Sequence, residues 1–183
     1  MKNLQPLTFI IPGIALLLAI FLYVFLRRRT FFKRAFTRFS FTIIIIAFLL
    51  NFAWEMLQMP LYEGMELTIT SVAFCGLASV ADTVLVLLLY YFFALVYREP
   101  FWVQKYTLQR IVVLALYGAT GAIVAEIVHV YAGNWTYSRL MPLIPFVDVG
   151  LSPVLQFMIL PVLTYYMSFY FLNKKYKINF LKI

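Results

Sequence analysis

The chain has 183 residues, of which 64% are apolar, 19% aromatic and only 12% charged, and its formal net charge is +8. A soluble domain is nearer half apolar and a quarter charged, so this composition predicts that lipid surrounds most of the chain. The positive charge would otherwise suggest nucleic acid. The basic residues lie in short runs between apolar segments, which membrane topology explains, so we expect no nucleic-acid partner.

Five apolar segments are each long enough to cross a bilayer as a helix. The predicted spans are residues 9–26, 39–59, 69–97, 111–131 and 150–172. The third is longer than one crossing requires, and Pro161 interrupts the fifth. Because the loops between them are short, we predict that residues 1–183 form a single all-α polytopic membrane bundle. Any chemistry must then take place within the bundle or at its surface.

The basic residues are concentrated in alternate loops. Residues 27–38, residues 98–110 and the C-terminal tail hold every lysine and arginine except Lys2 and Arg139. The basic residues of the tail are Lys174, Lys175, Lys177 and Lys182. Since short cytoplasmic segments carry an excess of lysine and arginine, this asymmetry predicts five transmembrane helices with the N-terminus outside and the C-terminus in the cytoplasm.

Polar and small residues recur at helical spacing on one face of four predicted spans. They are Asn51, Glu55 and Gln58; Ser71, Cys75, Ser79 and Asp82; Ala115, Ala119, Ala122, Glu126 and His129; and Pro153, Gln156, Leu160 and Thr164. Small residues mark close contacts between membrane helices, so the alanines predict that Glu126 and His129 face the interior of the bundle. With the predicted orientation, the polar groups gather in the outer half of the bundle.

Three carboxyl groups fall inside predicted spans, where an unpaired charge costs several kcal/mol. Glu55, Asp82 and Glu126 must therefore be protonated, paired with one another, bound to a cation or open to a water-filled cavity. His129 and Arg139 are the nearby side chains that could neutralise them. We interpret Glu55, Asp82, Glu126 and His129 as candidate catalytic residues.

Polar and aromatic residues near these carboxyl groups are candidate substrate-binding residues, namely Asn51, Gln58, Trp135, Tyr137 and Gln156. The amides also suit hydrogen bonds between helices, and the aromatic pair suits anchoring at the membrane interface. Glu126-x-x-His129 matches half of a di-iron carboxylate site, which needs a second such pair, and the chain has one histidine. We predict no metal site, with a divalent ion at Glu126 and His129 as the alternative, and leave cofactors open.

Three motifs resemble those of a family of small bacterial polytopic membrane proteins that has no assigned activity. They are Trp54-Glu55-x-x-Gln58-x-Pro60-Leu61-Tyr62, Trp135-x-Tyr137-Ser138-x-x-Met141-Pro142, and Gly150-Leu151-x-Pro153-x-x-Gln156 followed by Pro161. The resemblance covers the second to fifth spans and implies a bacterial inner membrane protein. Helix junctions rich in Trp, Tyr and Pro beside intramembrane acids are also similar to membrane carotenoid hydratases and cyclases, from which we transfer no catalytic residue.

Three functions fit these patterns. The first is an intramembrane enzyme that performs acid–base chemistry on a lipid or isoprenoid, with Glu126 or Glu55 as general acid and the other as base or cation stabiliser. Trp135 and Tyr137 would line its pocket. The others are an accessory or assembly protein whose polar network only fixes packing, and a small proton- or ion-coupled transporter. Membrane lipids and a hydrophobic small molecule are the expected partners; the oligomeric state stays open.

Overall fold

The computed structural model describes residues 10–176, and their side chains from residue 11 to residue 173; Lys2, Lys177 and Lys182 lie outside the described residues. Five helices are long and apolar enough to cross a membrane, as predicted. They are α1 (Ile10–Arg29), α2 (Lys33–Gln58), α3 (Ile69–Val96), α4 (Leu108–Tyr131) and α5 (Leu151–Tyr176). The protein is therefore an all-α bundle whose composition and length suit integration in a membrane.

The helices extend beyond the predicted spans mainly where the chain is basic. Because α1 ends at Arg29 and α2 begins at Lys33, the predicted linker 27–38 shrinks to a turn at residues 30–32. In that turn the backbone N–H of Phe32 donates to Thr30 Oγ1 at 3.3 Å. Hydropathy locates only the apolar part of a helix, whereas lysine and arginine are good helix formers whose long side chains reach polar surroundings.

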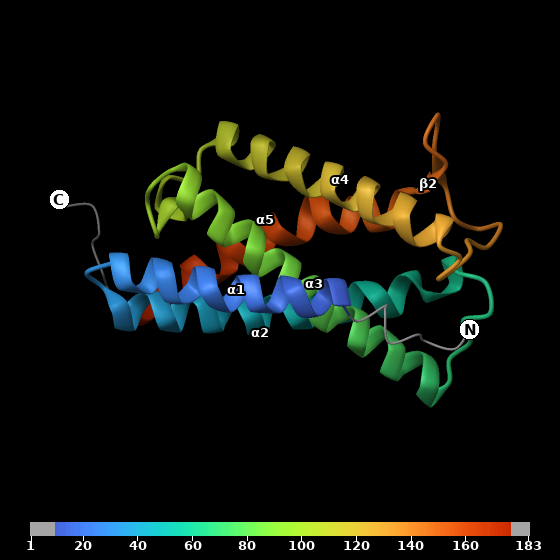
Figure 1. The fold of residues 1–183 in the computed structure, drawn as a ribbon, viewed down its shortest axis with the longest axis horizontal. Coiled ribbons are helices and arrows are strands. Elements are labelled where there is room, and N and C mark those ends of the chain that lie inside the picture. The colour runs from blue at the N-terminus through green and yellow to red at the C-terminus, as the bar shows by residue number, and fades with distance from the viewer. Residues whose placement is uncertain (1–9, 177–183) are drawn as a thin grey trace.

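The helices pack in a layered bundle in which α5 lies behind α4, and α1 lies in front of α2 and α3 (Figure 1). The most extensive contacts join α4 to α5, α2 to α3, α2 to α5, and α1 to α3. Most apolar side chains of α1 are exposed, among them Ile11, Leu17 and Phe21. Exposed apolar side chains of this kind are what a lipid-facing helix carries.

Residues 27–38 and 98–110 lie at the same end of the bundle, which we call the basic end (Figure 1). Here the short 3-10 helix η3 (Trp102–Lys105) buries Trp102 among the rings of Tyr90, Phe93 and Tyr165. The indole N–H of Trp102 donates to the carbonyl of Tyr90 at 3.2 Å. This aromatic layer fills the centre of the bundle at the basic end.

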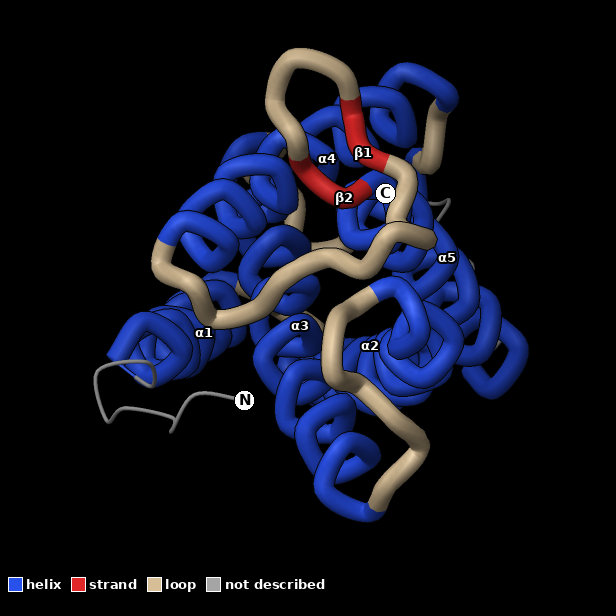
Figure 2. The backbone as a smooth tube through the Cα atoms, turned by 90° about the vertical axis from the view of Figure 1, so that its right-hand side faces the viewer, coloured by secondary structure: helices blue, strands red, loops and turns tan. Residues whose placement is uncertain are grey.

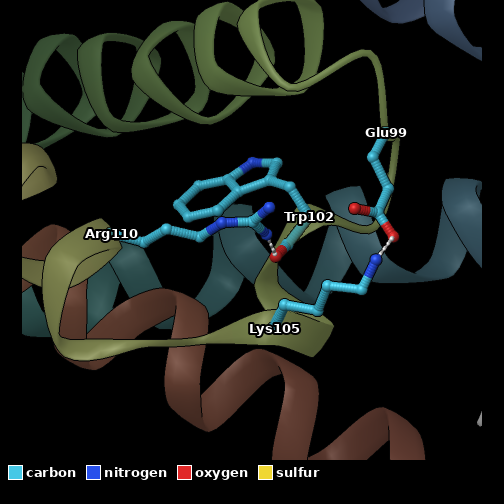
Figure 3. Close-up of polar contacts among 4 residues, drawn as sticks. All are labelled: Glu99, Trp102, Lys105 and Arg110. Carbon is cyan, nitrogen blue, oxygen red and sulfur yellow. Dashed lines mark hydrogen bonds and ion pairs between the residues drawn. The ribbon is translucent and has the colours of Figure 1, made fainter.

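Two basic side chains fasten the loop that carries Trp102 (Figure 3). Arg110 Nη1 donates to the carbonyl of Trp102 at 2.5 Å. Lys105 Nζ lies 3.8 Å from Glu99 Oε1. Thr107 caps the start of α4 by accepting from the backbone N–H of Arg110 at 3.4 Å. These contacts hold the loop in place over the basic end of the bundle.

At the opposite end, which we call the polar end, the loop after α2 pairs with the loop after α4. Tyr62 and Tyr137 form an antiparallel bridge, and the N–H of Ser138 donates to the carbonyl of Leu61 at 2.9 Å. The loops also include η2 (Met59–Leu61) and a hairpin of β1 (Leu143–Ile144) and β2 (Val149–Gly150). Figure 2 views the molecule from this end. The pairing brings the first two sequence motifs side by side.

Helices α4 and α5 lie in close contact at Gly118. A Cβ atom added there would lie 2.0 Å from the carbonyl oxygen of Phe157. Pro161 has no backbone N–H, so it cannot donate the usual helical hydrogen bond to that same carbonyl four residues earlier. The absence of a side chain at Gly118 allows this close approach of α4 to the Phe157 backbone, two turns before Glu126 on α4.

Candidate functional site

The polar faces of α2, α3 and α5 meet at Gln156, whose side chain is only 1% exposed. Its Nε2 lies 2.9 Å from Asn51 Oδ1, 3.2 Å from Glu55 Oε1 and 3.0 Å from Asp82 Oδ2. An amide nitrogen has two hydrogens, so these three acceptors share two donors. Gln156 therefore holds the carboxyl groups of Glu55 and Asp82 as close neighbours from two different helices.

A relay of hydrogen bonds fixes which way the amides point. Gln58 Nε2 donates to Glu55 Oε1 at 2.8 Å and to Gln156 Oε1 at 3.1 Å. Ser152 Oγ donates to Gln58 Oε1 at 2.8 Å, and Trp54 Nε1 donates to Ser152 Oγ at 3.2 Å. Glu55 Oε1 therefore accepts hydrogen bonds from two amides, those of Gln58 and Gln156.

Trp54 and Ser152 were not among the predicted site residues. Ser152 lies four residues before Gln156 on α5, and Trp54 lies next to Glu55 on α2. Helical spacing would have placed Ser152 on the polar face of α5, because residues four apart are neighbours on one face. The partner of the Trp54 indole is set by contact between distant helices, which spacing within one helix does not reveal.

Glu126 enters the site from α4 and is 7% exposed. Trp135 Nε1 donates to Glu126 Oε2 at 3.2 Å, and the hydroxyl of Tyr137 donates to the same oxygen. Burial, followed by this hydrogen bond, raises the pKa of Tyr137 above its ordinary value, so the phenol stays neutral and acts as a donor. The loop after α4 thus folds back and covers one side of the Glu126 carboxyl group.

A third ring, that of Tyr62, completes the aromatic cover. The Tyr62 ring lies edge-on to the Trp135 ring, with ring centroids 6.3 Å apart. The centroids of the Tyr62 and Tyr137 rings are 5.7 Å apart. Burial, followed by the nearby Glu126 carboxyl group, raises the pKa of the Tyr62 phenol. The bridge between the two loops therefore holds three neutral aromatic side chains next to the carboxyl groups.

A cavity of about 420 Å³ lies between these groups. Glu55, Asp82 and Glu126 all line it, together with Gln58 and Gln156. Its apolar lining includes Met59, Met65, Phe74, Ala78, Pro153 and Phe157. No lysine, arginine or histidine is among its described lining residues. The structure thus brings the three intramembrane carboxyl groups together around one space.

His129 lies one turn beyond Glu126 but does not line the cavity. Its ring stacks on Trp135, with centroids 4.4 Å apart, and its Nδ1 lies 2.7 Å from Asn134 Nδ2. His129 therefore supports Trp135 without lining the cavity itself. The position suits orientation of the Trp135 indole toward Glu126 better than contact with a substrate.

The predicted neutralising partners do not reach the carboxyl groups. Among the described side chains Lys105 pairs with Glu99 at the basic end, and neither His129 nor Arg139 forms an ion pair with Glu55, Asp82 or Glu126. The described residues also contain no group of three His, Cys, Asp or Glu side chains that could hold a metal ion. The alternative prediction, a divalent ion held by Glu126 and His129, therefore lacks a third His, Cys, Asp or Glu ligand among the described residues.

Comparisons of the chain with protein-family models, with curated proteins and with solved structures found no match. The function must therefore be argued from the chemistry of the site and not from likeness. What the site offers is a set of carboxyl groups, aligned amide donors and aromatic rings around a partly apolar space.

Proposed function

We propose that the protein is an intramembrane enzyme that transfers protons to and from a hydrophobic substrate, a lipid or isoprenoid, in the cavity at the polar end. The observation that carries this proposal is the convergence of Glu55, Asp82 and Glu126, from three helices, on one cavity. A volume of about 420 Å³ falls in the range of small-molecule sites, about 300–1,000 Å³. Packing alone requires neither the cavity nor the carboxyl groups that face it.

The location follows from charge. We propose that the basic end faces the cytoplasm of a bacterial cell, because short cytoplasmic segments are enriched in lysine and arginine. The N-terminus is then outside, the C-terminus is inside, and the cavity lies in the outer half of the inner membrane.

Glu126 is suited to act as the general acid. Both of its donors, from Trp135 and Tyr137, bind Oε2, which leaves Oε1 to carry the proton. Transfer of this proton to an alkene carbon forms a C–H bond from the π electrons and leaves a carbocation on the neighbouring carbon. The adjoining carboxyl pair of Glu55 and Asp82 stabilises this cation and accepts the proton released when it becomes an alkene or adds water.

The first test is incorporation of solvent deuterium into lipids. The purified protein in proteoliposomes, supplied with a membrane lipid extract in D₂O, is expected to yield lipids with carbon-bound deuterium, measured by mass spectrometry. Because acid–base groups contribute roughly 10²–10⁴-fold, Glu126→Gln is expected to slow incorporation at least about 100-fold. The exposed loop variant Glu66→Gln is the matched control and retains the wild-type rate.

Thermal unfolding in detergent accompanies each variant, so that loss of activity is separated from loss of fold. Wild-type deuterium incorporation in folded Glu126→Gln would contradict the proposal.

The polar relay favours a second candidate, an accessory protein in which buried amides only fix the packing of helices. It predicts that Glu55→Gln, Asp82→Asn and Glu126→Gln change thermal stability while the wild type shows no deuterium incorporation. A transporter is less well supported, because the aromatic layer around Trp102 fills the bundle between the cavity and the basic end.

A further inference from the structure

We propose that the cavity is loaded sideways from the bilayer, through a cleft between α3 and α4, by a long-chain molecule without an anionic group. The inference rests on the proposed function, since it names the substrate class and the route of access for the same cavity. It is drawn from the divergence of two helices and from the charges of the cavity lining.

Helices α3 and α4 contact each other through aromatic rings toward the basic end. There the ring of Tyr117 on α4 lies 5.7 Å from that of Phe92 and 5.4 Å from that of Phe93 on α3. Toward the polar end the two helices diverge, as both views show (Figures 1 and 2). Helix α4 packs mainly on α5, whereas α3 packs mainly on α2 and α1.

The cavity occupies the space that this divergence creates. Phe74 and Ala78 line it from α3, Glu126 from α4, and Phe157 from α5. The remaining span, α1, packs against α3 and α2 and makes no extensive contact with α4, so it does not join α3 to α4. We call the side of the cavity that Phe74, Ala78 and Glu126 line the lateral cleft.

The flanks of the lateral cleft suit contact with lipid chains. On α3, Leu77 and Val80 are exposed, and on α4 the exposed side chains are Val124, Ile127 and Val128. A hydrocarbon chain that passes between them exchanges one apolar environment for another. The route therefore imposes no desolvation cost on the chain, unlike passage through the polar loops.

The charges inside select against anions. Glu55, Glu63, Asp82 and Glu126 line the cavity, and no cationic side chain is among its described lining residues. A phosphate or carboxylate would lose its hydration and meet acidic groups instead of basic ones. A hydroxyl group can donate a hydrogen bond to the carboxyl oxygens, and a pure hydrocarbon has no charge that the carboxyl groups would repel. The lining thus favours an uncharged molecule.

Photolabelling tests this inference independently of turnover. The probes are a long-chain alcohol with a diazirine near its hydroxyl group and the phosphate monoester of the same alcohol. The full-length protein is placed in phosphatidylcholine vesicles, irradiated, and its labelled peptides are measured by mass spectrometry. Label on α1, whose apolar side chains face lipid, serves as the internal reference.

The alcohol is expected to label the cavity walls on α3 and α4, and the phosphate to label them at least about tenfold less, relative to α1. Ala78→Phe places a ring in the lateral cleft and is expected to lower labelling by the alcohol at least fivefold. Leu85→Phe adds a comparable ring at an exposed position of α3 away from the lateral cleft and outside the cavity lining, and keeps wild-type labelling.

Equal labelling of the walls by the phosphate, or unchanged labelling in Ala78→Phe, overturns the inference. If Ala78→Phe fails to fold, competition in the wild type decides: excess unlabelled alcohol must suppress the wall label, and excess unlabelled phosphate must not. Wall labelling by the alcohol without deuterium incorporation rejects the proposed enzyme and leaves the binding inference standing. Deuterium incorporation with equal labelling by the phosphate rejects the binding inference alone.

Discussion

Gly118→Ala is expected to destabilise the protein by about 1–3 kcal/mol, the usual cost of an added group in a well-packed interface. The new Cβ would lie 2.0 Å from the carbonyl oxygen of Phe157 and 2.9 Å from its carbonyl carbon. Both are backbone atoms, so no side-chain rotation relieves the overlap, and α4 must move away from α5. Thermal unfolding in detergent, followed by tryptophan fluorescence, measures the loss.

Gly121→Ala is the matched control for this prediction. Gly121 lies on the same helix, and a Cβ added there meets no atom within 4 Å. Alanine favours helix over glycine by up to about 1 kcal/mol, so this variant is expected to be neutral or more stable. Gly118→Ala should therefore lower the thermal stability, whereas Gly121→Ala should leave it unchanged or raise it. Equal changes in stability would show that Gly118 does not set the separation of the helices.

The displacement at Gly118 also reaches the site. Glu126 lies two turns along α4, where its carboxyl group meets donors from the loop after the helix. A shift of α4 changes the gap between Glu126 and the carboxyl pair of Glu55 and Asp82. Gly118→Ala is therefore expected to slow deuterium incorporation as well, whereas Gly121→Ala is not.

Gln156→Met is expected to destabilise the protein by about 2 kcal/mol. Methionine keeps the length of the side chain and removes the amide donors that Asn51, Glu55 and Asp82 now share. Each hydrogen bond between membrane helices is worth about 0.6 kcal/mol on average and up to about 1.7, and a buried acceptor without its donor adds to the loss. Thermal unfolding in detergent again measures the effect.

Thr164→Val supplies the control on the same face of α5. Thr164 is fully buried, and its hydroxyl oxygen finds no hydrogen-bond partner among the described residues. Replacing a buried, unpartnered hydroxyl by a methyl group removes a polar atom without breaking a contact, so the change should be neutral or stabilising. If Gln156→Met and Thr164→Val lower the thermal stability equally, the amide hydrogen bonds do not contribute to stability beyond burial.

The polar faces were predictable because they are properties of single helices. The spacing of Asn51, Glu55 and Gln58 placed them on one face, and Gln156 on the corresponding face of α5, before any contact was known. The small residues of α4 likewise indicated that Glu126 points inward, and the structure buries it. The buried face is formed with Leu114, Gly118 and Ala122, whereas the predicted Ala115 and Ala119 are only partly buried. Helical periodicity is a local rule, so a sequence alone carries it.

His129 shows where such reasoning ends. The same spacing placed His129 on one face with Glu126. In the structure its ring contacts Trp135 and Asn134, and His129 itself does not line the cavity. A residue at the last turn of a helix is surrounded by the following loop, and the path of that loop depends on pairing with the loop after α2. Spacing within one helix contains no information about that pairing.

The sequence by itself determined five apolar helices, their basic loops and the inward faces that carry Glu55, Asp82, Glu126 and Gln156, because transfer into lipid acts on each segment separately. Only the tertiary structure decided that these faces meet around one cavity, that Trp135 and Tyr137 fold back onto Glu126, and that α3 and α4 part beside it. Those arrangements depend on contacts such as that of Gly118 with Phe157, which lie far apart in the chain and become neighbours only when the helices pack.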